Sequence, residues 1–140
     1  MRLLLDTNVV SQFVSEDPDE GVIAWLDRQA PDRIYTCAIT IHELWFGAIL
    51  MAPGRRRRNL ERALDGLFTT MFAQKVWHLD EASARVSGEI EAKRQQAGKR
   101  IDRADCMIAG IAITNASTLV TRNVKHFRDT DVKIFDPWGG

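Results

Sequence analysis

The sequence has little cysteine, no excess of either charge and no long apolar run. Its two cysteines, Cys37 and Cys106, lack the spacing of a zinc site, so we expect two reduced thiols in the core. Lys plus Arg and Asp plus Glu number 19 each. The basic excess typical of many nucleic-acid-binding proteins is therefore absent, and such a function would depend on local patches and a site. The apolar run at 3–5 is too short for a signal peptide or a membrane span. We expect a cytoplasmic protein with no membrane partner.

The composition that remains is that of one ordinary globular domain. The chain has 140 residues, of which 45% are hydrophobic and 27% charged, so a single domain over 1–140 is expected. Residue patterns predict strands that alternate with helices, which favours an α/β fold with a central, mostly parallel β-sheet and helices on both faces. The predicted strands are 2–6, 33–39, 75–79, 118–121 and 132–135. The predicted helices are 7–14, one starting at Asp17-Pro18, 40–50, 55–74, 80–98 and 102–115.

Three acidic residues lie where these elements meet. Asp6 follows the first strand, and Glu43 and Asp105 lie near the starts of two helices. Each has a purely local alternative: Asp6 as a helix cap, Glu43 as partner of Thr40 in a capping box, and Asp105 as a first-turn acid behind the N-cap Asp102. In a parallel sheet, however, such positions converge at the carboxyl ends of the strands.

Converging carboxylates have a chemical consequence. They raise one another's pKa unless a cation lies among them. Oxygen ligands without His or Cys favour Mg²⁺ or Mn²⁺ over zinc. Such ions activate water and stabilise leaving oxygens in phosphodiester hydrolysis, so the acids favour a metal-dependent nuclease.

Four segments resemble the ordered motifs of the PIN-domain family. They are 3–10 around Asp6, 38–47 around Glu43, 103–110 around Asp105 and 119–127 around Asn123. The chain length is similar to that of VapC-type toxins, and the closing segment 135–138 is similar to their FitB-like branch. The resemblance implies a PIN-like fold, Mg²⁺ or Mn²⁺ at the acids, and cleavage of structured RNA, often tRNA.

The same resemblance assigns roles to individual residues. Asp6, Glu43 and Asp105 would bind the metal and act in catalysis. Asn123 stands where many members carry a fourth acid, so it would contribute an amide that orients a water, and fewer ions would be held tightly. Asn8 and Thr121 would shape the site through hydrogen bonds. The sequence offers no evident histidine base among its three histidines, His42, His78 and His126.

Basic residues are candidates for contacts with the RNA backbone. A run of four arginines sits badly with the positive end of a helix dipole, which suggests a role beyond helix stability. Arginine contacts to phosphate provide affinity that does not depend on sequence. The candidates are Arg55, Arg56, Arg57 and Arg58, with Arg100, Arg103 and Lys125 closer to the acidic motifs.

The resemblance also implies partners. An apolar face would pack in the core, and part of it would receive an antitoxin protein or a second copy in a homodimer; its residues are Trp45, Phe46, Leu67, Phe68 and Phe72. A higher assembly with the antitoxin on operator DNA would follow. Two alternatives remain open, a metal-dependent DNA nuclease and a non-catalytic PIN module. A phosphatase of the haloacid-dehalogenase type needs a second Asp where this chain has Asn8, so the sequence argues against that class of enzyme.

Overall fold

Five parallel strands form one sheet in the computed structural model, which describes residues 1–139. Their order is β3-β2-β1-β4-β5. The strands are β1 (Leu3–Leu5), β2 (Ile34–Cys37), β3 (Val76–Trp77), β4 (Thr118–Val120) and β5 (Lys133–Phe135). Each parallel neighbour is reached through a crossover that contains helix, as parallel pairing demands. The predicted α/β fold with a parallel sheet is confirmed.

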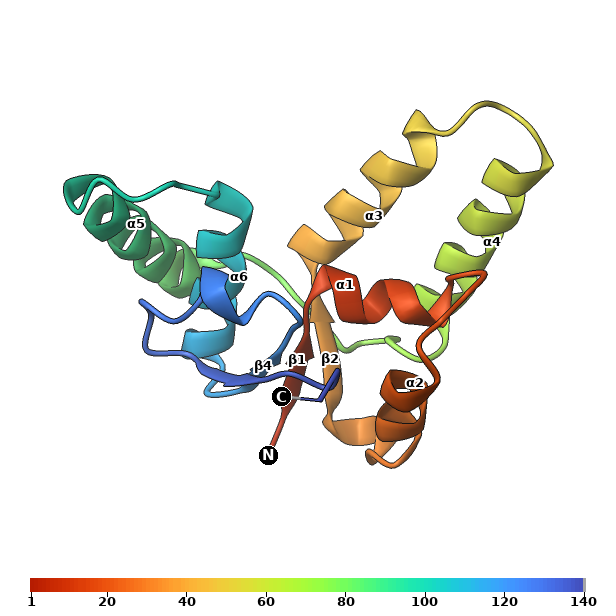
Figure 1. The fold of residues 1–140 in the computed structure, drawn as a ribbon, viewed down its shortest axis with the longest axis horizontal. Coiled ribbons are helices and arrows are strands. Elements are labelled where there is room, and N and C mark those ends of the chain that lie inside the picture. Colours follow the sequence, from red (N-terminus) through yellow and green to blue (C-terminus); the bar gives the residue numbers. More distant parts are fainter. Residues whose placement is uncertain (140) are drawn as a thin grey trace.

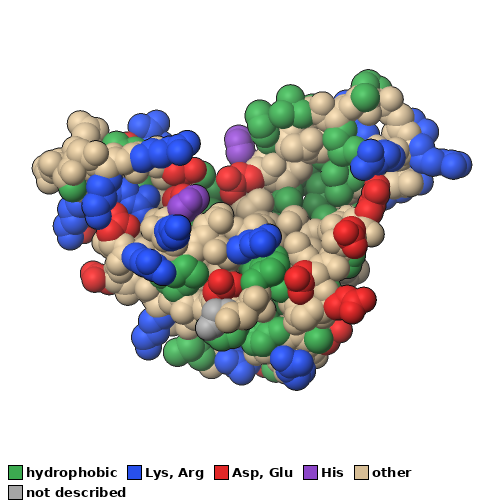
Figure 2. Space-filling model, viewed as in Figure 1, with side chains coloured by type: hydrophobic (Ala, Val, Ile, Leu, Met, Phe, Trp, Pro, Cys, Tyr) green, Lys and Arg blue, Asp and Glu red, His purple; other side chains and the backbone are tan. Residues whose placement is uncertain are grey.

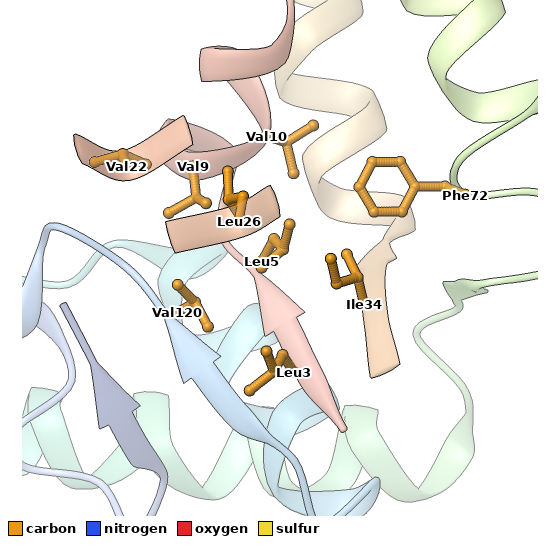
Figure 3. Packing of buried hydrophobic residues seen from close by; sticks show 9 residues of the cluster. All are labelled: Leu3, Leu5, Val9, Val10, Val22, Leu26, Ile34, Phe72 and Val120. Carbon is orange, nitrogen blue, oxygen red and sulfur yellow. The ribbon is translucent and has the colours of Figure 1, made fainter. Parts of the chain in front are cut away.

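The helices cover both faces of this sheet, and the side-chain alternation of β1 explains why (Figure 1). Leu3 and Leu5 belong to one buried cluster and Leu4 to the other, because successive strand residues point to opposite faces. Figure 3 shows the first cluster, in which Phe72 packs near Leu5 and Ile34. The helices are α1 (Thr7–Val10), α2 (Glu20–Asp27), α3 (Ala38–Leu50), α4 (Arg55–Thr69), α5 (Glu81–Gln96) and α6 (Arg103–Thr114).

Two predicted helix starts are wrong. α2 is capped by Asp19, whose carboxylate accepts the Val22 N–H at 3.0 Å, and not by Asp17. Residues before it form a turn in which Gln12 accepts the Asp19 N–H, so Pro18 lies outside the helix. α3 begins at Ala38, directly after β2, and Thr40 is a buried residue inside the helix. The capping box between Thr40 and Glu43 therefore does not exist.

Other predicted ends are confirmed. Asp80 caps α5 by accepting the Ser83 N–H at 2.9 Å, and Asp102 caps α6 by accepting the Asp105 N–H at 3.2 Å. The chain leaves α5 through Gly98, whose positive φ of 67° suits glycine at a helix C-terminus. The helix predicted over 55–74 ends earlier, at Thr69, and a turn carries Phe72 back into the core.

Two arms rise from the carboxyl ends of the strands. The hairpin of α3 and α4 projects on one side and the pair α5–α6 lies on the other (Figure 1), and the space-filling view shows a notch between them (Figure 2). α1 starts at the base of this notch, immediately after β1. Within residues 1–139, no helix is long and apolar enough to cross a membrane.

Candidate active site

Asp6 lies at the base of the notch, where β1 passes into α1. Only 3% of the residue is exposed, and its carboxylate accepts three hydrogen bonds: from the Thr7 N–H at 2.8 Å, the Thr121 hydroxyl at 2.7 Å and the Asn8 amide at 3.2 Å. Burial raises the pKa of this carboxyl, and the hydrogen bonds oppose that rise. Asp6 thus caps α1 and also presents a desolvated carboxylate to the site.

Glu43 approaches from α3, on the opposite wall of the notch. The Thr7 hydroxyl donates to its carboxylate at 2.5 Å, so one residue of α1 touches both acids. Burial raises the pKa of Glu43, and the negative charges of Asp6 and Asp102 add to that rise. The latter effect means that α3 brings Glu43 within electrostatic reach of the start of α6.

Asp105 closes the cluster from the first turn of α6. Burial is the largest cause that raises its pKa from 3.8 to about 6, and the charges of Asp102 and Asp6 contribute further. Within residues 1–139, its side-chain partner is His126, whose Nδ1 lies 3.0 Å from the Asp105 carboxylate. Asp102 caps α6 and is a fourth negative charge at the site. Figure 2 shows acidic side chains on both walls of the notch, with a histidine beside them.

The three predicted acids therefore lie around one notch, with Asp6 within electrostatic reach of both Glu43 and Asp105, but they do not form a closed cage. No three Asp, Glu, His or Cys side chains among the described residues are placed to hold one ion between them. The donor set is nonetheless of the kind that Mg²⁺ or Mn²⁺ prefers, oxygen only and without thiolate. Burial is the largest cause of the raised pKa of all three acids, and the negative charge of Asp6 adds to the rise at Glu43 and Asp105. A bound cation would offset both effects.

Thr121 and Asn8 join the segments at the base of the notch through hydrogen bonds, and their role in shaping a catalytic site stays a prediction. The Thr121 hydroxyl donates to Asp6 and accepts the Asn123 N–H at 3.0 Å, and the Asn8 side chain accepts the Arg122 N–H at 3.1 Å. Asn123 thus reaches the site through its backbone. Its exposed side chain makes no hydrogen bond within residues 1–139, and it lines a neighbouring hollow. Its role as a fourth catalytic residue stays a prediction.

The basic candidates divide into two groups. A hollow of about 460 Å³ joins Asp102 and Asp105 to Lys125, with Lys99, Arg100 and Arg128 also in its walls. Arg103 points elsewhere, because it makes two hydrogen bonds of 3.0 Å to Glu91. The arginines at 55–58 begin α4 at the outer end of the hairpin, away from the acids (Figure 1), and two of them are paired, Arg56 with Glu16 and Arg57 with Glu61.

Sequence reasoning missed two residues near Asp105. His126 contacts that carboxylate directly, and Arg94 of α5, only 5% exposed, holds the segment that carries His126. The Arg94 guanidinium donates to Asp129 through two N–H groups at 2.9 Å each and to the His126 carbonyl. These contacts join residues 21 to 35 positions apart, and no local pattern in the sequence signals them.

Comparison with known proteins supports the same family as the sequence motifs. A sequence model of the PIN domain matches residues 3–133. The toxin FitB of Neisseria gonorrhoeae is 35% identical over 97% of this chain and 98% of its own length. The VapC ribonuclease Y4jK of Sinorhizobium fredii is 34% identical over 97% of each chain. The crystal structure of FitAcB from Neisseria gonorrhoeae matches with a TM-score of 0.89 and 35% identity over 99% of both chains. This chain belongs to the PIN-domain family, with FitB- and VapC-type proteins among its relatives.

Proposed function

We propose that the protein is a metal-dependent endoribonuclease that acts as the toxin of a toxin–antitoxin pair, with structured RNA, tRNA above all, as substrate. The observation that carries the proposal is the placement of Asp6, Glu43 and Asp105 around one notch, where burial raises the pKa of each. Relatives of nearly the same length named as a VapC ribonuclease and a toxin support it.

The acids would hold Mg²⁺ or Mn²⁺. When bound, such an ion supplies a Lewis acid that favours attack by water and stabilises charge on the phosphate. The chain's own residues prepare this site. Thr121, Asn8 and the Thr7 N–H orient the Asp6 carboxylate, and the Thr7 hydroxyl fixes Glu43. His126 keeps Asp105 in place, and Lys125 in the adjoining hollow would contact the RNA backbone.

An antitoxin would occupy the inner side of the α3–α4 hairpin. A groove of about 780 Å³ runs there between the segment after α1, α3 and α4, with Leu44, Ala48 and Leu60 among its residues and Glu43 in its wall. A basic residue at the end of the inserted segment would pair with the acids and block them. Inhibition that survives removal of the antitoxin's basic tail would exclude this arrangement. A joint assembly on operator DNA is part of the same proposal.

The decisive experiment is cleavage of end-labelled total tRNA by the purified, partner-free protein in Mg²⁺, Mn²⁺ or EDTA. We expect discrete products that need a divalent ion and disappear with Asp6→Asn and with Asp105→Asn. Asp65→Asn is the matched control, because Asp65 is an exposed acid on α4 and makes no ion pair within residues 1–139. It should cleave as the wild type does.

The same assay separates the alternatives. Cleavage of DNA in place of RNA would make the protein a DNA nuclease, because metal chemistry on a phosphodiester does not itself select the sugar. Folded protein that cleaves neither substrate in any metal, yet still binds an antitoxin, would identify a non-catalytic PIN module. Products that persist in EDTA would contradict the metal dependence.

A further inference from the structure

Residues 125–129 form a ridge between the hollow beside Asp105 and a second hollow. Lys125, His126 and Arg128 of this ridge line both hollows. The second hollow, of about 510 Å³, lies on the far side of the ridge from Asp105, next to β5, and no acid of the candidate active site lines it. A chain that crossed the ridge would thus leave the acids and enter this hollow.

The ridge is held rigidly in place. Arg94 is nine-tenths buried or more and binds both ends of the segment, through the His126 carbonyl and the Asp129 carboxylate. Asp129 also forms an ion pair with Lys99, with the ammonium nitrogen 3.8 Å from its carboxylate. The side chains on the ridge therefore project from a fixed backbone and need little ordering when a ligand binds.

The hollow has an apolar floor with a prepared aromatic ring. Trp25 stacks on the Phe135 ring, with centroids 4.8 Å apart and planes at 20°. Phe135 is fixed by this contact, yet 39% of it remains exposed. Ile134 also lines the hollow, from the other face of β5. A flat, apolar ligand would find here the kind of surface on which nucleobases stack.

The rim of the same hollow is cationic, in a chain whose formal net charge is zero. Arg122, Lys125 and Arg128 line it and make no ion pair within residues 1–139. The one carboxylate there, Asp136, already accepts the Trp138 N–H at 2.9 Å, and the Arg122 guanidinium lies 5.2 Å from the Trp138 ring centroid. Figure 2 shows the Lys and Arg side chains that gather beside the notch. An apolar floor with a cationic rim matches a nucleotide, with its base inside and its phosphate at the edge.

We propose that this hollow is a nucleotide subsite, in which a base of single-stranded RNA next to the scissile phosphate stacks on Phe135 while Lys125 and Arg128 bind the intervening backbone. The inference rests on the proposed ribonuclease function, since it names the path of that enzyme's substrate. It assigns substrate selection partly to residues outside the acidic cluster.

Binding of a short, fluorescein-labelled single-stranded RNA of mixed sequence tests the subsite without any cleavage. Anisotropy is followed in EDTA across a range of salt concentrations. Arg128→Ala should weaken binding and lower the slope of log Kd against log salt by roughly 1, as the loss of one phosphate contact does. Phe135→Leu keeps an apolar side chain and removes the ring. It should weaken binding roughly threefold to tenfold with the salt slope unchanged.

Arg62→Ala is the charge-matched control, because Arg62 is exposed on α4, in the other arm. It should bind as the wild type does. Equal losses in Arg62→Ala and Arg128→Ala, or wild-type affinity in Phe135→Leu with an unchanged melting temperature, would overturn the proposal. So would binding of oligoglutamate with the same sensitivity to Arg128→Ala and no binding of RNA, which would assign the hollow to an acidic protein segment.

Cleavage assays in Mg²⁺ or Mn²⁺ keep the two proposals apart. Wild-type protein that binds RNA through Arg128 and Phe135 but cleaves nothing would contradict the proposed ribonuclease function and support the nucleotide site. Suppose instead that the wild type cleaves RNA, and that both variants bind and cut it as the wild type does. That result would contradict the subsite and support the ribonuclease function. A shifted set of cleavage positions in Phe135→Leu would support both.

Discussion

Asp105 is a residue whose charge is unfavourable in the folded chain until a cation or a proton relieves it. Its carboxyl is partly buried beside Asp102 and within reach of Asp6, and only His126 opposes these effects. The pKa rises from 3.8 to about 6, so the folded chain binds the proton more tightly than the unfolded chain does. Stability of the metal-free protein therefore falls as pH rises from about 4 to about 6.

Asp105→Asn should stabilise the metal-free protein. Above about pH 6 the variant lacks the repelled charge, and we expect a gain of roughly 1–3 kcal/mol in the free energy of unfolding, reduced by the lost contact with His126. The gain should shrink as pH falls and vanish below about pH 3, where the wild-type carboxyl is protonated in both states. Thermal unfolding in EDTA at a series of pH values measures it, with Asp65→Asn, at an exposed acid of α4, as the control.

Addition of a divalent ion should stabilise the wild type more than it stabilises Asp105→Asn. Mg²⁺ or Mn²⁺ should raise the melting temperature of the wild type, because a ligand that binds only the folded state stabilises it. The rise should be smaller in Asp105→Asn. A variant that is less stable than the wild type in EDTA at neutral pH would show that Asp105 serves the fold more than the site.

At the scale of elements, the close packing of α5 on α6 places Asp105. Gly110 of α6 makes the approach possible, since a Cβ there would lie 2.5 Å from the Ser83 carbonyl oxygen and 3.1 Å from the Ser87 nitrogen. These are backbone atoms that cannot turn aside. Gly110→Ala should therefore destabilise the protein by roughly 2 kcal/mol or more, although alanine is the better helix former.

Gly88 on α5 provides a control, because its substitution by alanine should change the stability in the opposite direction. A Cβ at Gly88 meets no atom within 4 Å, so Gly88→Ala should stabilise the protein by roughly 0.5–1 kcal/mol. Urea denaturation of both variants gives the comparison. Equal effects of the two substitutions would mean that helix propensity, and not the contact with α5, governs position 110.

The connection between α5 and the ridge depends on one ion pair. Arg94 lowers the pKa of Asp129, so the pair contributes stability above that group's ordinary pKa, and the contribution is lost as pH falls through the lowered folded value. Asp129→Asn leaves a buried guanidinium without its charge partner and should cost roughly 2–4 kcal/mol at neutral pH. The cost should disappear in strong acid. Glu81→Gln, which breaks an exposed pair with Arg85, should cost at most about 0.5 kcal/mol in the same thermal unfolding series.

The sequence predicted these elements well where local chemistry decides them and poorly where packing does. Asp80 and Asp102 are caps because a carboxylate at that place meets free N–H groups of its own helix. Thr40 and Asp17 offered equally good local caps, yet β2 runs straight into α3 and Gln12 binds the Asp19 N–H. Long-range contacts outweighed the local signal. The acids were found from their places after strands, whereas Arg94 and His126 are recognisable only once α5 and the ridge are side by side.

At the scale of the whole molecule, the hairpin of α3 and α4 exposes apolar surface that no described residue covers. Phe46, Ile49 and Leu50 are 60%, 51% and 70% exposed, whereas Phe72, from the same predicted apolar face, is fully buried. Their spacing places them on one side of α3, toward its outer end. The predicted apolar face therefore divides into a core part and an outer part. Contiguous exposed apolar side chains are typical of an interface, and we expect a second copy of the chain to cover them.

We therefore expect the partner-free protein to be a dimer in sedimentation equilibrium, and Leu50→Glu to be a monomer. In a two-fold dimer each contact occurs twice. The Leu50→Glu substitution would therefore bury two unpaired carboxylates in the interface, which is unfavourable. Ile101→Glu is the control, because Ile101 is 36% exposed in the other arm and should leave the dimer intact. Circular dichroism should show both variants folded, since neither side chain belongs to a buried cluster. A wild type that stays monomeric at every concentration would exclude self-association through this face. A Leu50→Glu variant that stays dimeric would move the interface away from α3.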